Sequence, residues 1–135
     1  MIGYAEVKTK LVHFNVGRNS SFNIQNTVMP FEQETLNVGN AFNISTGIFT
    51  APLSGTYFFI FSSFADNTYS SLSFNLQLND AQIAICYSPY GIYYCNIPYT
   101  LKLSSGDRIQ VYLQQGSTNN VNFVGWLVEE DIFDS

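Results

Sequence analysis

The chain has 135 residues, of which 46% are hydrophobic, 16% aromatic and only 11% charged, and its formal net charge is −5. This length allows one domain with a hydrophobic core of its own. Five Lys and Arg residues cannot form the basic stripe that phosphate binding requires, which argues against nucleic acid as a partner. No apolar run approaches the roughly 20 residues of a membrane span, and the first residues lack the basic start and apolar stretch of a signal peptide.

Short alternating segments separated by turn residues run along the whole chain, which predicts an all-β domain. In chain order, we expect strands at residues 10–15, 28–34, 47–50, 56–64, 72–78, 82–86, 99–103, 109–114 and 122–128. About eight to ten short strands at this spacing are typical of a sandwich or jelly roll. We therefore expect a single domain over residues 1–135, with a core from about residue 7 to 128 and an acidic tail from 129 to 135.

Two cysteines, Cys86 and Cys95, bracket a tyrosine-rich segment. Their spacing suits a disulfide that closes a hairpin, which would contribute about 2–3 kcal/mol in the chain-entropy model, and it equally suits two buried free thiols. The CxxC spacing of zinc and redox sites is absent. The triplets that begin at Asn19 and Asn43 would permit N-glycosylation in a secretory compartment, which favours an extracellular protein.

Four blocks of residues stand in a fixed order along the chain. They comprise Asn37, Gly39, Phe42, Thr46-Gly47, Phe49, Pro52, Gly55, Tyr57 and Phe59, then Leu76-Gln77-Leu78-Asn79, then Leu101-Lys102-Leu103-Ser104-Ser105-Gly106-Asp107, and finally Phe123-Val124-Gly125-Trp126-Leu127. In order and spacing these blocks resemble the C1q domain family, the globular heads of the C1q/TNF superfamily. The resemblance covers residues 7–128, nearly the whole chain.

The resemblance implies a ten-stranded antiparallel jelly roll with two five-stranded sheets, assembled as a tight homotrimer. The aromatic excess and the few charges are consistent with a large apolar interface. Tyr57, Phe59 and Phe123 are the candidates for contacts around the threefold axis, and the alternative is that they only fill the core of the single chain.

Several heads of the family bind calcium through carboxylates in the connections before the Gly-Asp turn. This chain has no Asp or Glu between Asp80 and Asp107, so we expect no metal and no other cofactor. A collagen-like stalk is not expected within the chain because no Gly-X-Y repeat is present.

Catalysis is not expected. His13 is the only histidine and stands in a predicted strand, and no nucleophile motif such as Gly-x-Ser-x-Gly occurs. One histidine is also too few for the His-rich metal sites of jelly-roll oxygenases. We therefore expect a binding protein and not an enzyme.

Two loops have the composition of recognition surfaces. Tyrosine supplies rigid amphipathic contact area, and amides and hydroxyls supply adaptable hydrogen bonds. The candidate ligand-binding residues are Tyr87, Tyr90 and Tyr93 in one loop and Gln115, Asn119 and Asn120 in the other. The alternative is that the tyrosines pack across strands and that the amide loop is merely solvated.

The resemblance and these loops together predict a secreted, trimeric head of innate immunity that recognises microbial surface glycans in a lectin-like manner. Three weak sites on one trimer would gain avidity if the ligands are spaced to be engaged together. One alternative is a secreted signalling or adhesion ligand of a protein receptor, as in cerebellin-like and adiponectin-like relatives. Another is a structural cap that only trimerises a longer filament.

Overall fold

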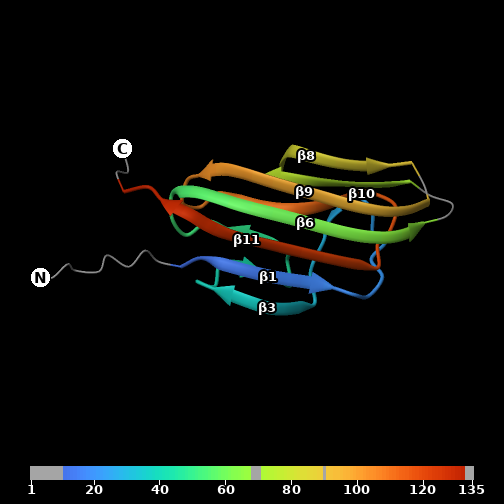
Figure 1. The fold of residues 1–135 in the computed structure, drawn as a ribbon, viewed down its shortest axis with the longest axis horizontal. Coiled ribbons are helices and arrows are strands. Elements are labelled where there is room, and N and C mark those ends of the chain that lie inside the picture. Colours follow the sequence, from blue (N-terminus) through green and yellow to red (C-terminus); the bar gives the residue numbers. More distant parts are fainter. Residues whose placement is uncertain (1–10, 68–70, 90, 133–135) are drawn as a thin grey trace, which may run out of the picture.

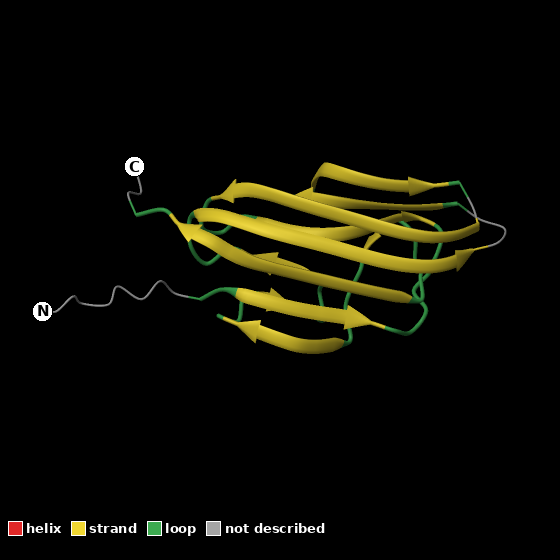
Figure 2. Ribbon diagram, in the orientation of Figure 1, coloured by secondary structure: helices red, strands yellow, loops and turns green. Residues whose placement is uncertain are grey.

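The computed structural model describes residues 11–67, 71–89 and 91–132, and every element in these ranges is a β-strand (Figures 1 and 2). The strands are β1 (His13–Arg18), β2 (Thr27–Val28), β3 (Gln33–Val38), β4 (Phe42–Asn43), β5 (Ile48–Thr50), β6 (Gly55–Asn67), β7 (Leu72–Leu78), β8 (Ala81–Ser88), β9 (Gly91–Leu103), β10 (Arg108–Gln115) and β11 (Asn120–Glu130). The described part of the chain has no helix that could cross a membrane.

The strands form two antiparallel sheets packed face to face. The five-stranded sheet has the order β3-β1-β11-β6-β9, and the second sheet has the order β4-β5-β10-β7-β8, with the two-residue β2 added beside β10. The prediction of an all-β fold with two sheets of five main strands is confirmed, and β2 is an addition to it. Figure 1 shows β1, β11, β6 and β9 running side by side along the length of the molecule.

β6 and β9 extend well beyond the segments that the sequence pattern predicts. β6 continues through Asp66 and Asn67, which the sequence reads as a break, because these residues pair with Ile92 and Gly91 of β9. The sequence pattern predicts β9 only from residue 99, and the part of β9 before that residue contains Pro98. Since β9 is the edge strand of its sheet, a proline is tolerated there.

The acidic tail was predicted to start at residue 129, but its first two residues are part of the last strand. Glu129 and Glu130 belong to β11 and pair with Thr56 and Gly55 of β6. The backbone N–H of Asp131 then donates to the carbonyl oxygen of Ser54 at 2.9 Å. Backbone pairing holds these acidic residues in the sheet although their side chains are solvated.

The core lies between the sheets and is built largely from phenylalanine rings. Tyr57, Phe59 and Phe123 are each 0% exposed in the single chain, and their rings pack against one another and against Phe14 and Phe49. A side chain without exposed surface offers nothing to a second subunit, so the structure favours the alternative that these residues fill the core of the single chain. Their alternation with neighbouring residues of β6 turns other side chains to the outer face.

The hydroxyl group of Tyr57 is paired inside this core. It donates to the carbonyl oxygen of Leu53 at 2.7 Å. Burial raises the pKa of the phenol, so Tyr57 remains a neutral hydrogen-bond donor at physiological pH.

Two blocks singled out in the sequence meet at one end of the sandwich. The side chain of Asn79, after β7, donates to a carboxylate oxygen of Asp107 at 3.0 Å and accepts the backbone N–H of Arg108 at 2.9 Å. Asp107 also accepts the N–H of Ser104 at 2.8 Å. These bonds hold the β7–β8 turn against the β9–β10 turn, and they lower the pKa of Asp107 by stabilising its charged form, the Asn79 bond contributing most.

Replacement of Gly125 by alanine should destabilise the domain. A β-carbon at this position would overlap the rings of Phe14 and Phe59, both of which are buried in the core. We expect Gly125→Ala to reduce the free energy of unfolding by about 1–3 kcal/mol, measured by urea denaturation. Thr100→Ala, on the exposed outer side of β9, is the matched control, and an equally small effect of both changes would contradict the overlap.

The Asp107 carboxylate should make stability depend on pH in the acid range. Because its pKa is lowered in the folded state, its contribution is present above the unfolded value of about 3.9 and is lost as the pH falls through the folded value. Asp107→Asn should therefore lower the melting temperature at pH 7 and flatten its decline between pH 5 and pH 2. Parallel melting-temperature profiles for the two proteins would show that the carboxylate carries no such contribution.

Candidate functional site

The two loops predicted to carry recognition lie at the same end of the sandwich. The β8–β9 and β10–β11 connections are both at the end opposite to the start of β1 and the end of β11 (Figure 1). The connection from β1 to β2 lies there as well. A ligand at this end would therefore approach the molecule away from the described chain ends.

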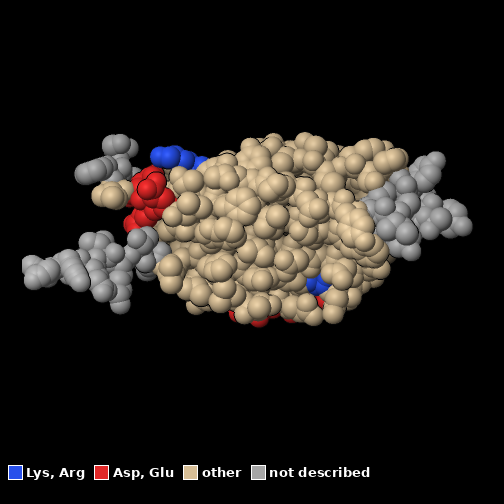
Figure 3. Space-filling view, viewed as in Figure 1, with Lys and Arg blue, Asp and Glu red and all other residues tan. Residues whose placement is uncertain are grey.

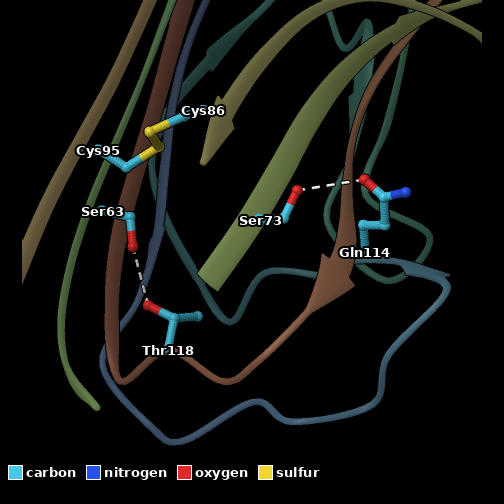
Figure 4. The surroundings of a disulfide bond; sticks show 6 residues. All are labelled: Ser63, Ser73, Cys86, Cys95, Gln114 and Thr118. Carbon is cyan, nitrogen blue, oxygen red and sulfur yellow. Dashed lines mark hydrogen bonds between the residues drawn. A yellow bond between two sulfur atoms is a disulfide. The ribbon is translucent and has the colours of Figure 1, made fainter. Parts of the chain in front are cut away.

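The β10–β11 connection is held firmly in place. Thr118 is only 2% exposed, and its hydroxyl is 2.9 Å from the hydroxyl of Ser63 in β6 (Figure 4). Its backbone exchanges two hydrogen bonds with Phe22 of the β1–β2 connection, at 2.8 and 3.0 Å. Thr118 thus anchors the connection to the fold, while the amide side chains of Gln115, Asn119 and Asn120 remain exposed.

Cys86 and Cys95 form a disulfide, which settles the alternative that the sequence leaves open (Figure 4). Their Cα atoms are 6.0 Å apart. Cys86 belongs to β8 and Cys95 to β9, which are edge strands of different sheets. The bond therefore ties the two sheets together and does not close a hairpin within one sheet.

The disulfide fixes the direction of the tyrosines beside it. Since both cysteines point into the sandwich, the adjacent Tyr87 and Tyr94 point outward from their respective sheets. Tyr87 is 61% exposed and Tyr94 is 76% exposed. They lie at the same end of the molecule but on opposite outer faces.

Tyr87 belongs to a row of polar groups on the outer face of the second sheet. Ser73 of β7 pairs with Tyr87 on one side and with Gln115 of β10 on the other. A bulge in β10 also brings Gln114 to this position, where its carbonyl oxygen accepts the hydroxyl of Ser73 at 3.1 Å (Figure 4). We call Tyr87, Ser73, Gln114 and Gln115 the tyrosine–amide row.

The row is compact and preformed. Neighbouring strands lie about 4.8 Å apart, so Tyr87 and Gln115 on either side of Ser73 are about 10 Å apart. Exposed Ile85, two residues before Tyr87, continues the same outer face. The row thus combines an exposed ring with amide and hydroxyl groups, and none of its members carries a charge.

The other predicted residues do not join this row. Asn120 begins β11 and pairs with Phe64 on the five-stranded sheet, where it lines a shallow cavity of about 200 Å³ with Tyr94 and Asn96. Asn119 is exposed in the connection before β11. Tyr90 and the side chain of Tyr93 lie outside the described residues.

Sequence reasoning missed Ser73 and Gln114. The alternation of residues 72–78 places Ser73 on the polar face of its strand, which was a usable signal. Its importance depends on β7 lying between β8 and β10, and a strand order of this kind is set by long-range pairing that local patterns do not encode.

The outer face of the five-stranded sheet is a second candidate surface. We call it the uncharged face, and its side chains are those of His13, Asn15, Phe58, Ile60, Ser62, Phe64, Asn96, Pro98, Thr100, Asn122, Val124 and Trp126. Figure 3 shows it as a broad surface with charged residues only near its margins. Residues 57–61 are apolar on both sides of β6, so the sequence pattern does not distinguish the buried face from this outer face.

An aromatic cluster occupies one half of this face. Trp126 packs against Phe58 with ring centroids 4.9 Å apart and against His13 at 5.8 Å. Val124 and Ile60 are paired in the next row, and Ser62 and Asn122 follow in the row after it. A contiguous apolar surface of this kind marks an interaction site in soluble proteins.

Metal binding finds no support in the described ranges. No group of three or more His, Cys, Asp or Glu side chains there is arranged to hold a metal ion.

Comparison with known proteins finds a matching family model and two proteins of similar sequence. The C1q domain model matches residues 13–128. The chain is 28% identical over 128 residues to complement C1q tumor necrosis factor-related protein 3 of Homo sapiens and 29% identical over 127 residues to that of Mus musculus. Each alignment covers 88% of this chain and 52% of the relative, so the chain spans about half the length of these proteins.

Solved structures agree on the architecture. The globular domain of zebrafish complement 1qA protein superimposes with a TM-score of 0.79 at 19% identity, over 89% of this chain and 99% of that domain. Eiger TNF of S. frugiperda gives a TM-score of 0.69 at 15% identity, over 92% of this chain and 94% of that one. At these identities the likeness concerns the fold, and it confirms the predicted jelly roll.

Proposed function

The chain belongs to the C1q domain family, and from that premise we propose that it is a secreted, homotrimeric recognition head that binds neutral glycans of microbial surfaces without catalysis and without a metal ion. At the level of the family, a domain of the C1q/TNF type is a ligand-binding or signalling module. Assembly, export and the nature of the ligand are each argued below from this chain's own residues.

The uncharged face supports assembly from three copies. Large obligate interfaces are apolar and poor in charge, and this face presents Trp126, Phe58, Ile60 and Val124 across neighbouring strands. Trp126 remains 37% exposed in the single chain. A second and a third copy of the chain are the occupants that we propose for this face. Around a threefold axis such contacts are heterologous, so the face of one copy would meet a different patch of the next copy.

The disulfide supports an extracellular location. Such bonds persist in oxidising compartments and are rare in the reducing cytosol. Cys86 and Cys95 also join two sheets next to the proposed ligand surface, so the bond would keep that surface ordered outside the cell.

The tyrosine–amide row is the observation that supports glycan binding. The apolar side of a sugar ring stacks on an exposed aromatic ring, and its hydroxyl groups pair with amides and hydroxyls. Tyr87 provides the ring, and the exposed amides of Gln114 and Gln115 provide the polar partners. Ser73 is only 3% exposed and holds Gln114 in place through its hydroxyl. The absence of charge within the row favours a neutral sugar over an acidic one, and strands on both sides preorganise the site.

A protein receptor is a second candidate ligand. It is favoured by Ile85, which is 51% exposed on the same outer face as Tyr87 and would be buried by a flat protein partner. Binding to a receptor would be insensitive to free sugar, whereas glycan binding would be competed by it.

A charge placed on the uncharged face should separate the subunits. We expect Ile60→Glu to convert a trimer into a monomer, because assembly would bury the new carboxylate without a partner, and light scattering measures the change in mass. Ile85→Glu introduces the same group on the opposite outer face and should remain trimeric. A monomeric wild-type protein, or a trimeric Ile60→Glu variant, would contradict assembly through this face.

Loss of the Tyr87 ring should weaken glycan binding. On a glycan and bacterial-surface array, Tyr87→Ala should lower affinity about tenfold per site, whereas Tyr87→Phe should retain binding because stacking does not require the hydroxyl. Binding of the wild type should persist in EDTA. A blank array from a well-folded trimer would contradict the lectin function for the glycans tested and direct the search to protein receptors.

A further inference from the structure

We propose that Asn43 is an N-glycosylation site of the exported protein, and that its glycan leaves both the uncharged face and the tyrosine–amide row open. The sequence contains two possible acceptor triplets, Asn19-Ser20-Ser21 and Asn43-Ile44-Ser45. The structure distinguishes between them. The inference depends on export of the chain but not on trimer formation or on glycan recognition.

Asn43 presents its side chain to solvent from a fixed position. It ends β4, the edge strand of the second sheet, where the preceding Phe42 is buried at 4% exposure and Asn43 itself is exposed. Alternation along the strand therefore directs the Asn43 side chain outward.

The carboxamide is held in an Asx turn that leaves its nitrogen free. The oxygen Oδ1 of Asn43 accepts the backbone N–H groups of Ser45 at 3.0 Å and of Thr46 at 3.3 Å. Within the described structure, the nitrogen Nδ2 has no hydrogen-bond partner. Ser45, whose hydroxyl completes the acceptor triplet, is also exposed.

The residues after the triplet stabilise this turn. The N–H of Gly47 donates to the carbonyl oxygen of Asn43 at 2.8 Å, and Gly47 has a φ of +77°. A β-carbon at Gly47 would overlap the carbonyl group of Met29, so only glycine fits. The turn that exposes Asn43 is thus built from the Thr46-Gly47 pair of the family pattern.

There is also room for a sugar beside Asn43. An open cavity of about 520 Å³ is lined by Asn43, Thr46, Ile48, Thr50 and Arg108, among others. Its walls combine polar and apolar groups, as the two sides of a sugar ring require. The cavity lies on the β4–β5 side of the second sheet, whereas the tyrosine–amide row lies across β8, β7 and β10 near the opposite end.

Asn19 lacks these features. It is exposed in the β1–β2 connection, but no Asx turn forms there. The hydroxyl of Ser20 instead donates to the carboxylate of Glu32 at 2.6 Å. A glycan at Asn19 would also stand at the recognition end of the molecule.

In the proposed glycosylation of Asn43, the sugar donor is a lipid diphosphate-linked oligosaccharide. Nδ2 of Asn43 forms a bond to the anomeric carbon of the first sugar and loses one proton. The bond from that carbon to the diphosphate oxygen breaks, and the lipid diphosphate leaves with the electron pair.

Peptide mapping of secreted protein tests the proposal. The chain is expressed behind a secretion leader in insect cells, treated with an amidase that removes N-glycans in ¹⁸O-water, and analysed by mass spectrometry for conversion of Asn43 to labelled Asp. We expect labelled Asp at position 43 and a reduction in intact mass after deglycosylation. An unlabelled Asn43 in the secreted wild type would overturn the proposal, whatever the variants do.

Matched variants test which residue carries the glycan and whether the glycan affects assembly or binding. Asn43→Gln and Ser45→Ala should each remove the mass shift of this site, while Asn19→Gln should retain it. Deglycosylated and glycosylated protein should have the same number of subunits and the same array binding. A change of either property on removal of the Asn43 glycan would overturn the claim that it leaves both surfaces open.

Discussion

β6 lies between β11 and β9 in the five-stranded sheet and is apolar on both faces over residues 57–61. One face, with Tyr57 and Phe59, is fully buried against the second sheet. The other face, with Phe58 and Ile60, has no covering element within the described chain. Strands that are apolar on both sides are typical of sheets that are covered on both faces, and a second copy of the chain is the cover that we propose for the outer face.

The ends of the sandwich are closed by polar contacts between turns that are distant in the chain. At one end, Asn79 bonds to Asp107 and joins two turns of the family pattern. At the other end, Thr118 bonds to Ser63, and the Cys86–Cys95 disulfide ties the edge strands of the two sheets. Both ends are thereby fixed, and a site at either end requires little ordering when a ligand binds.

The fold class was predictable because local alternation and turn residues agree with the global architecture. The ends of the strands were less predictable. Asp66, Asn67 and Pro98 look like breaks in the sequence, but the pairing of β6 with β9 over its whole length overrides their preference. Tyr87 and Gln115 were found by their composition, whereas their meeting at Ser73 depends on the strand order, which no local pattern reveals.

The two outer faces of the sandwich differ in the chemistry that they present. The five-stranded sheet exposes an aromatic cluster around Trp126 whose rings already pack against one another, which suits a rigid apolar partner surface. The second sheet exposes Tyr87 beside the amides of Gln114 and Gln115, which suits a small polar ligand. Because the sheets face in opposite directions, assembly through the first face would leave the second exposed on every subunit, and identical sites would then be displayed together as multivalent recognition requires.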